Sequence, residues 1–412
     1  MVTAQKKQNI PNGWKETKLS KLLVEVNERN REHAELPVLS VTNSRGFVLQ
    51  SEQFARNLHS KNTSNYKIVS KEQFAYNPAR INVGSIALLR KWEKGLLSPM
   101  YVVFSTKDEL LNDYLQYYIQ SPRFSVQVSN NTAGSVRKSL NFNAFEHFDY
   151  VYPESKQEQK KIVEVLASVD EEMQKTKEVI KATEKLKKGL MQKLFTQGIG
   201  HTKFKQTELG EIPDGWKLRR LGDIADISRG GSPRPIEAFI TSDSKGYNWL
   251  KIGDIKPGSK YVYETKEKIK KEGLTKTTLV EIGDFILSNS MSFGRPYIMK
   301  TNACIHDGWL AFKNINSDII DKEYLYYLLL SDYVQKSFYL ASAGSGVKNL
   351  KKETVSNVLV AISSPAEQGK VVEIMSSVDD KLAINKKLLA KQTELKKGLM
   401  QDLLSGVKRV TI

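Results

Sequence analysis

Apolar residues recur at alternating steps of four and three in two stretches of this chain, residues 158–194 and residues 367–403. The two stretches align without a gap at a constant offset of 209 residues, and the segment LKKGLMQ is identical in both. Most other positions are Lys or Glu, as on the solvated face of a helix. The spacing is a heptad seam, which predicts two helices of about 37 residues, each roughly 55 Å long. The first seam consists of Ile162, Leu166, Val169, Met173, Ile180, Leu190 and Leu194.

Two arrangements of these helices are open. They could pack on each other as an antiparallel coiled coil about a pseudo-two-fold axis, or each could be a surface helix on the core of its own half. We favour the coiled coil, because helices of this length rarely pack on one small domain. Polar residues interrupt the seams at their midpoints, Thr176 in the first and Asn385 in the second. A hydrogen bond between them would fix the register of the pair at some cost in stability.

A second repeat opens each half of the chain. The segment IPNGWK at residues 10–15 corresponds to IPDGWK at residues 212–217. Pro-Asn-Gly and Pro-Asp-Gly are turn sequences, and we expect the tryptophan after each turn to anchor the segment in a core.

Short β-branched and aromatic runs between turn residues predict strands in both halves, near residues 36–41, 83–89 and 101–104 and near 249–252, 282–287 and 309–312. A tyrosine-rich helix follows in each half, at 114–119 and 324–329, and we assign its tyrosines to the core. The predicted fold class is α+β: two similar domains separated by two long helices, produced by tandem duplication. The predicted parts are residues 1–155, the first helix 156–198, a connector 199–211, residues 212–364, and the second helix 365–412.

Composition indicates a polyanionic partner. The formal net charge is +17 and the pI is about 9.5, which favours nucleic acid, although a lysine-rich composition alone would give the same charge. Cys304 is the single cysteine, which excludes an internal disulfide and a thiolate zinc cluster. No apolar run reaches transmembrane length, and the first residues lack a secretory signal, so we expect a cytoplasmic protein without a membrane partner.

Catalytic motifs are absent from the sequence. It has no HExxH, no Walker A loop and no glycine fingerprint for a dinucleotide, and its five histidines are scattered. Asn77-Pro78 is only a fragment of an adenine methyltransferase motif, and the acidic residues near Asp254 only loosely resemble a nuclease pattern. We interpret the chain as non-catalytic, without a cofactor or metal of its own.

The candidate DNA contacts lie in loops that follow the predicted strands. Residues 228–235 carry two arginines and, we expect, exposed backbone at Gly230 and Gly231; arginine can bind guanine in two places or hold a phosphate. The loop at 344–350 and its counterpart at 134–140 could present backbone N–H groups to phosphate, or could be plain turns. The candidates are Asn43, Arg45, Arg90, Lys91, Trp92, Ser135, Arg137 and Lys138 in the first half, and Arg229, Ser232, Arg234, Lys251, Lys256, Ser290, Ser292, Arg295, Ser345, Lys348 and Asn349 in the second.

The duplicated helices and the paired IPxGW openings resemble the specificity subunit of type I restriction-modification enzymes. The segments RGGSP at 229–233, WLKIGD at 249–254 and YNPARI at 76–81 also resemble segments of that family. The resemblance covers nearly the whole chain, although the first half lacks the glycine-rich loop at residues 25–30. It implies two target recognition domains, each reading one half of a split site in double-stranded DNA, on helices that set the half-site spacing.

The resemblance also implies partners. The helices would dock two methyltransferase subunits and, through them, restriction or translocase subunits, so that methylation and cleavage, with S-adenosylmethionine and ATP, belong to those partners. Three other interpretations are open: a stand-alone DNA-binding regulator, a fragment of a fused methyltransferase or nuclease, and a coiled-coil scaffold without a DNA role.

Overall fold

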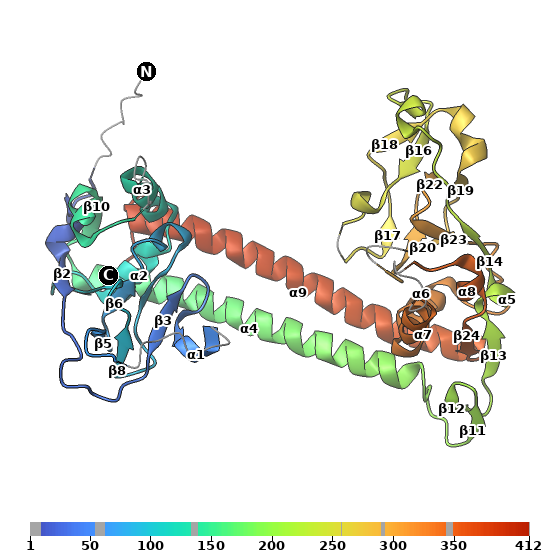
Figure 1. Ribbon diagram of the computed structural model, residues 1–412, viewed down its shortest axis with the longest axis horizontal. Helices are drawn as coiled ribbons and strands as arrows, with labels where there is room; N and C mark the ends of the chain where they lie inside the picture. The colour runs from blue at the N-terminus through green and yellow to red at the C-terminus, as the bar shows by residue number, and fades with distance from the viewer. Residues whose placement is uncertain are drawn as a thin grey trace. The chain divides into compact units, whose positions relative to one another are not determined.

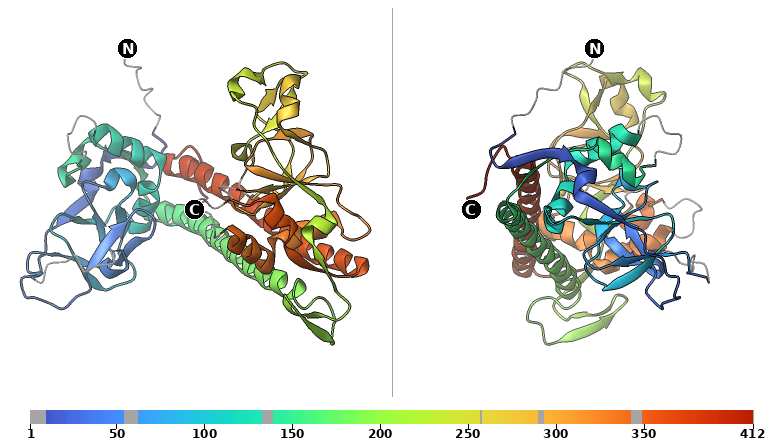
Figure 2. Two further views of the ribbon diagram at one scale, coloured as in Figure 1. Left: turned by 45° about the vertical axis from the view of Figure 1, so that its right-hand side comes forward. Right: turned by 90° about the vertical axis from the view of Figure 1, so that its left-hand side faces the viewer.

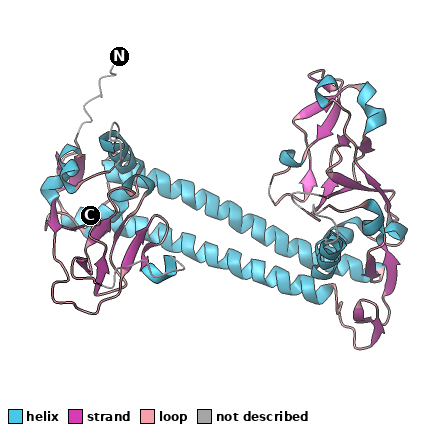
Figure 3. Cartoon of the chain, viewed as in Figure 1, coloured by secondary structure: helices cyan, strands magenta, loops and turns pink. Residues whose placement is uncertain are grey.

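The computed structural model describes residues 10–53, 62–132, 139–256, 258–289, 293–342 and 349–411. The chain forms two compact units, unit 1 from Met1–Lys177 with Lys387–Ile412, and unit 2 from Glu178–Lys386. Both units mix helices and strands (Figure 3). Each unit takes about half of each long helix, so the units differ from the parts predicted by sequence order. The two units are described separately below.

The two expected long helices are present as α4 (Lys156–Leu194) and α9 (Pro365–Ser405). Proline suits the first turn of α9, where a backbone N–H has no helical partner. Glycines in the left-handed region, Gly198 (φ 67°) and Gly406 (φ 73°), follow the two helices and turn the chain away. Within each unit the helix segments lie side by side (Figure 1; Figure 2).

In each unit the helix segments run antiparallel. In unit 2, Lys187 pairs with Asp379 and Glu184 pairs with Lys386. Residue numbers therefore rise along one helix where they fall along the other. In unit 1, Lys396 pairs with Asp170 at 2.7 Å.

Both cores contain the ends of both helices. The main core of unit 1 includes Ile162 and Leu166 of α4 with Leu403 of α9. The main core of unit 2 includes Leu194 of α4 with Val371 of α9. The alternative in which each helix packs only on its own half is therefore wrong.

The strands of unit 1 form one larger sheet and three pairs. The larger sheet has the order β2-β9-β6-β7, with all neighbours antiparallel. Its strands are β2 (Leu23–Val26), β9 (Val102–Thr106), β6 (Phe74–Tyr76) and β7 (Ile86–Leu88). The pairs are β1 (Trp14–Lys18) with β10 (Asp149–Pro153), β3 (Leu39–Thr42) with β4 (Gly46–Leu49), and β5 (Lys67–Ser70) with β8 (Lys94–Leu97).

The strands of unit 2 repeat the first sheet and add a second. The repeated sheet has the order β14-β23-β20-β21-β17, from β14 (Asp226–Arg229), β23 (Trp309–Lys313), β20 (Phe285–Ser288), β21 (Pro296–Met299) and β17 (Tyr261–Val262). The added sheet has the order β15-β18-β16-β22-β19, from β15 (Ile240–Thr241), β18 (Glu267–Ile269), β16 (Tyr247–Leu250), β22 (Ala303–Ile305) and β19 (Thr278–Val280). The pair β13 (Lys217–Arg220) with β24 (Leu359–Ile362) corresponds to β1 with β10, and the hairpin β11 (Phe204–Thr207) with β12 (Gly210–Pro213) lies in the connector.

Short helices complete each unit and cover the sheets. In unit 1 these are η1 (Leu19–Leu22), α1 (Gln50–Gln53), η2 (Ile81–Val83), α2 (Asn112–Ile119), α3 (Pro122–Thr132) and η3 (Phe142–His147). In unit 2 they are α5 (Leu221–Ile224), η4 (Ile236–Ala238), η5 (Ile252–Asp254), η6 (Lys271–Lys276), α6 (Lys322–Leu330), α7 (Asp332–Ser342) and α8 (Lys352–Ser356). The tyrosines of α2 and α6 are buried, which confirms their assignment to the core.

Each opening tryptophan is buried against a glutamate at the start of a long helix. In unit 1 the indole N–H of Trp14 donates to Glu158 Oε1 at 3.2 Å. In unit 2 the indole N–H of Trp216 donates to Glu367 Oε2 at 3.0 Å. The predicted anchoring of both tryptophans is confirmed, with a buried carboxylate as a partner that the sequence did not indicate.

A second repeated contact ties α2 and α6 to the long helices. In unit 1 the hydroxyl of Tyr117 donates to Asp170 Oδ2 at 3.0 Å, and Asp170 also pairs with Lys396. In unit 2 the hydroxyl of Tyr327 donates to Asp379 Oδ2 at 2.9 Å. Asp379 pairs with Lys187, so each globular part is bonded to both helices.

Candidate nucleic-acid interface

The turn at residues 306–308, between β22 and β23 of unit 2, connects loops that the sequence presented as separate candidates. Asp307 Oδ1 accepts a hydrogen bond from the Ser232 hydroxyl at 2.9 Å. The Asp307 carbonyl accepts from Arg229 Nε at 3.1 Å and from Asn289 Nδ2 at 2.8 Å. One aspartate thus holds the loop at 229–235 and Asn289, the first residue after β20.

Residues 349–350, the described end of the candidate loop at 344–350, reach the same place. The backbone N–H of Leu350 donates to the carbonyl of Asn289 at 3.2 Å, and Asn289 N–H donates to the carbonyl of Gly308 at 3.0 Å. Asn349, the neighbour of Leu350, is half-buried. Described residues of three second-half loops, Arg229, Asn289 and Leu350 among them, are therefore linked to this one turn.

The backbone of Gly230 and Gly231 is used inside the unit. Gly230 N–H donates to the Trp309 carbonyl at 2.9 Å, and Gly231 N–H donates to the Ile305 carbonyl at 3.1 Å. A Cβ at Gly230 would collide with the carbonyl oxygen of His306. The expectation that these glycines expose backbone to a ligand is wrong: they are glycines because the loop runs against the turn.

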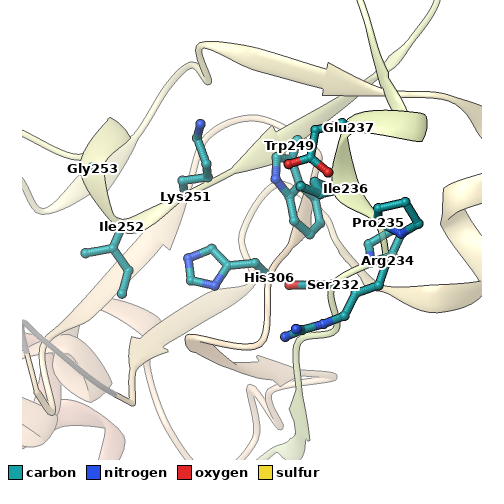
Figure 4. Close-up of a pocket in the computed structure, with 11 residues that line it drawn as sticks. Ser232, Arg234, Pro235, Ile236, Glu237, Trp249, Lys251, Ile252, Gly253 and His306 are labelled. Atoms are coloured by element: carbon teal, nitrogen blue, oxygen red, sulfur yellow. The ribbon is translucent and has the colours of Figure 1, made fainter.

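A pocket of about 620 Å³ opens beside this turn (Figure 4). Its walls are residues 232–237 of the loop, residues 249–253 at the end of β16, and His306. Trp249 is 2% exposed and its ring centroid lies 6.3 Å from that of His306. Ser232, Arg234 and Lys251, three predicted contacts from two segments 17 residues apart, line this one pocket, whose size suits a small planar ligand.

The electrostatics of the turn favour a neutral histidine beside a charged aspartate. Burial lowers the pKa of His306, against the opposing effect of Asp307. Burial opposes the ionisation of Asp307, but the hydrogen bond from Ser232 and the proximity of His306 and Arg229 lower its pKa below the usual value. Arg234, with 81% of its side chain exposed, lies 3.6 Å from Asp307 Oδ2 and remains mostly at the rim.

The remaining second-half candidates are more dispersed. Lys251 pairs with Glu267, and Lys256 is exposed. Arg295 is exposed but lines a different cavity, together with Tyr326 and Asp379 beside the long helices. The structure thus separates Arg295 from the pocket at residue 306.

In unit 1 the candidates fall at the β3–β4 turn and after β7. Asn43 and Arg45 are exposed on that turn, and the Arg45 N–H donates to the Thr42 hydroxyl at 3.0 Å. Lys91 Nζ lies 4.8 Å from the ring centroid of Trp92. Arg90 differs from its neighbours, because its guanidinium pairs with two carboxylates of its own unit, Glu72 and Asp113.

Seven candidates lie outside the described residues: Ser135, Arg137, Lys138, Ser290, Ser292, Ser345 and Lys348. The two helix residues proposed to set the register are described. The Thr176 hydroxyl donates to the carbonyl of Glu172 at 2.9 Å, and Asn385 Nδ2 donates to the carbonyl of Lys381 at 2.8 Å. Each bond lies within its own helix, and the pairing of the two residues stays a prediction.

Within the described ranges, no group of three or more His, Cys, Asp or Glu side chains could hold a metal ion. Cys304 is buried in β22, and burial raises the pKa of its thiol to about 11. Among the described helices, none combines the length and apolar character that crossing a bilayer requires.

Sequence reasoning missed His306, Asp307 and Asn289. All three lie next to segments that were singled out, but none carries a motif. An available signal was the turn composition of His-Asp-Gly before the buried strand β23, which corresponds to Ser-Pro before β9 in the first half.

The family model described as the type I restriction modification DNA specificity domain matches residues 28–183 and 213–393. The chain is 28% identical over 340 residues to the type I restriction enzyme MjaVIII specificity subunit of Methanocaldococcus jannaschii, covering 80% of this chain and 77% of that protein. It is 24% identical over 368 residues to the putative MjaX specificity subunit of the same organism, covering 87% and 83%.

Solved structures share the fold. A chain from a study of complex assembly and conformational transition in the type I R-M system superposes with a TM-score of 0.62 at 17% identity, covering 96% of this chain and 99% of that one. The type I restriction-modification S subunit from M. genitalium gives a TM-score of 0.55 at 15% identity, covering 97% of both chains.

Proposed function

This chain belongs to the family of type I restriction-modification DNA specificity domains, and we propose that it reads a two-part site in double-stranded DNA, with one globular part for each half-site. The two globular parts would lie at opposite ends of an antiparallel coiled coil of α4 and α9. The strongly basic composition supports contact with phosphates, which makes affinity dependent on salt. Such a subunit would act where the chromosome is, in the cytoplasm.

One observation carries this proposal: the contacts to the helices repeat, whereas the loops do not. The Trp14–Glu158 bond repeats as Trp216–Glu367, with the glutamates 209 residues apart and the tryptophans 202 apart. Both members of the ion pairs Lys396–Asp170 and Lys187–Asp379 are related by the helix offset of 209. Two domains held in the same way but carrying different loops suit the recognition of two different sequences from a common frame. Base edges are read by such variable side chains, while phosphate contacts only position the protein.

The helices also support the docking of two equivalent partners. A pair of exposed aliphatic residues, seven positions apart, repeats on the two helices: Val179 (39% exposed) and Leu186 (53%) on α4, and Leu388 (43%) and Leu395 (54%) on α9, which also exposes Ile384 (66%). The second pair repeats the first at the offset of 209. Aliphatic side chains at heptad spacing suit a partner helix, and their duplication suits two copies of one methyltransferase subunit. Restriction or translocase subunits would join through those subunits, and adenine methylation and DNA cleavage would be reactions of the partners.

The first test is to reconstitute the full chain with a methyltransferase subunit and to map the methylated adenines in a genome. We expect a two-part motif with a fixed gap. Scattered methylation, or one uninterrupted motif, would contradict the proposal. A stand-alone DNA-binding regulator, the second candidate, would bind a specific duplex without retaining a methyltransferase subunit during purification.

The spacer role has a sharper test in the same assay. Residues 175–181 and the equivalent residues 384–390 are duplicated together, which adds one heptad to each helix and keeps the apolar spacing. Each helix becomes about 10 Å longer, so the gap should grow by roughly three base pairs with both half-site sequences unchanged. A changed half-site sequence with an unchanged gap would refute the spacer role.

A further inference from the structure

The pocket at the turn of residues 306–308 holds a histidine whose tautomer is fixed by the backbone. The N–H of Gly308 donates to His306 Nδ1 at 2.8 Å, whereas Asp307 Oδ1 lies 3.6 Å from the same nitrogen, beyond hydrogen-bond distance; the Gly308 contact therefore favours the tautomer without a proton on Nδ1. A neutral imidazole then carries its proton on Nε2. A Cβ at position 308 would collide with the ring, so glycine is required for this arrangement. The imidazole projects between Ile252, Lys251 and Trp249 (Figure 4).

Lys251, which lines the pocket together with His306, is also a hydrogen-bond donor. The Lys251 ammonium has three N–H groups, and Glu267 is its ion-pair partner across the strands. It is close enough that its charge contributes to lowering the pKa of His306, after the larger effect of burial. Oδ1 of Asp307 accepts from the Ser232 hydroxyl at 2.9 Å and lies 3.6 Å from His306 Nδ1, so the aspartate faces Nδ1 and leaves Nε2 to the pocket.

We propose that this pocket takes the major-groove edge of a guanine in the half-site read by the second domain, with His306 Nε2–H donating to N7 and Lys251 donating to O6. This inference rests on the proposed function, because it requires that unit 2 reads DNA. Guanine is the base whose major-groove edge presents two adjacent acceptors and no donor. Adenine and cytosine present an amino group, which would face a donor here.

The pocket offers one competing acceptor. Glu237 is exposed on the rim, and its carboxylate could accept from the amino group of cytosine or adenine. Its position on the short helix η4, away from the turn, separates it from the fixed imidazole (Figure 4). A Glu237→Gln variant therefore distinguishes the two ways of using the pocket.

The test uses the complex of the full chain with its methyltransferase subunit and the genome-wide map of methylated sites. His306→Ala should accept other bases at one guanine of the second half-site, while the first half-site and the gap stay unchanged. His306→Gln, which keeps a donor at similar reach, should retain the guanine. His147→Ala, an exposed histidine of unit 1, is the matched control and should change nothing.

A base analogue tests the contact itself. In a duplex with 7-deazaguanine at that position, N7 is missing, and wild-type affinity should fall about tenfold. The same analogue should have no further effect on His306→Ala, because the two changes remove one hydrogen bond. Equal losses in both proteins would overturn the assignment, as would a change of the recognised base in Glu237→Gln but not in His306→Ala.

Failure of this inference is distinct from failure of the proposed function. If the wild-type complex gives no two-part motif, the proposed function is wrong. If it gives a two-part motif whose second half is indifferent to His306, only the guanine pocket is wrong. Loss of both half-sites in His306→Ala, with His306→Gln unable to restore them, would show a structural role for the histidine and would also overturn the pocket.

Discussion

The two tryptophan junctions use the same residue type on the helices but different additional partners. In unit 1, Glu158 accepts from Trp14 and pairs with Arg409, which follows the last helix. In unit 2, Glu367 accepts from Trp216, and His201 of the connector lies 3.0 Å away. The helix residues repeat because both junctions hold the same kind of domain. The additional partners differ because each comes from the segment that follows a long helix, Arg409 after α9 and His201 after α4, and these two segments differ in sequence.

The candidate DNA contacts differ far more than the junctions. In unit 1, Arg90 is paired with two carboxylates and Lys91 lies over Trp92. In unit 2, Asp307 holds Arg229 and Ser232 beside a pocket. The comparison shows that the contacts to the helices were kept through the duplication, while the loops on the same scaffold were free to change.

The largest loss of stability is expected when the carboxylate at either tryptophan junction, Glu158 or Glu367, is removed. Glu158→Ala and Glu367→Ala should each lower the free energy of unfolding by about 3 kcal/mol, because each leaves a buried indole N–H without its acceptor and removes a second partner, Arg409 for Glu158 and the Ile199 N–H for Glu367. Urea unfolding gives the size of the loss, and hydrogen exchange of residues 10–20 and 212–221 locates it. Glu164→Ala, at an exposed position of α4, is the control and should cost under 0.5 kcal/mol. A loss at only one junction would mean that the repeated sequence has no repeated role.

Alkaline pH should affect both units alike. Burial raises the pKa of Tyr118 in unit 1 to about 12, and that of Tyr326 in unit 2 to about 12. The protonated phenol is favoured in the folded state, so this stability is present below pH 10 and is lost as pH rises from 10 to 12. At pH 11 each tyrosine should account for a loss of about 1 kcal/mol in the free energy of unfolding. Tyr118→Phe or Tyr326→Phe should reduce that loss. Chemical unfolding between pH 8 and 11 measures this loss of stability, and Tyr263→Phe, at an exposed tyrosine, is the control. If only one of Tyr118 and Tyr326 contributed, the two units would not respond alike.

Removing Arg409 should lower the free energy of unfolding less than removing Glu158 or Glu367. Arg409→Ala should cost about 1 kcal/mol, because the ion pair is bidentate but 40% of the arginine side chain is exposed. The cost should shrink in 1 M salt, which screens exposed charges. Thermal unfolding at two salt concentrations measures both effects, with Lys408→Ala, at a more exposed pair with Asp402, as the control. A salt-independent loss of 3 kcal/mol would place Arg409 among the core contacts instead.

The smallest expected effect is a gain. Thr176→Leu combined with Asn385→Leu should raise the melting temperature by a few degrees, because each polar group is bonded only to its own helix and Leu adds apolar contact at the seam. The register of the helices should loosen, which disulfide trapping of cysteines placed along α4 and α9 would detect. A fall in melting temperature would contradict the proposed role of the pair.

The sequence by itself determined the parts of this protein that repeat along the chain. The heptad spacing required α4 and α9, and the turn before Trp14 and before Trp216 required an anchored strand in each half, because these signals depend on residues a few positions apart. Only the tertiary structure decided which loops meet. Ser232 and Asp307 are 75 residues apart, and Asn289 and Asp307 are 18 apart, so no local pattern records their bonds. The turn at residues 306–308 becomes a site because the sheets bring these segments together, and the close approach of neighbouring atoms leaves no room for a Cβ at Gly230, Gly231 and Gly308.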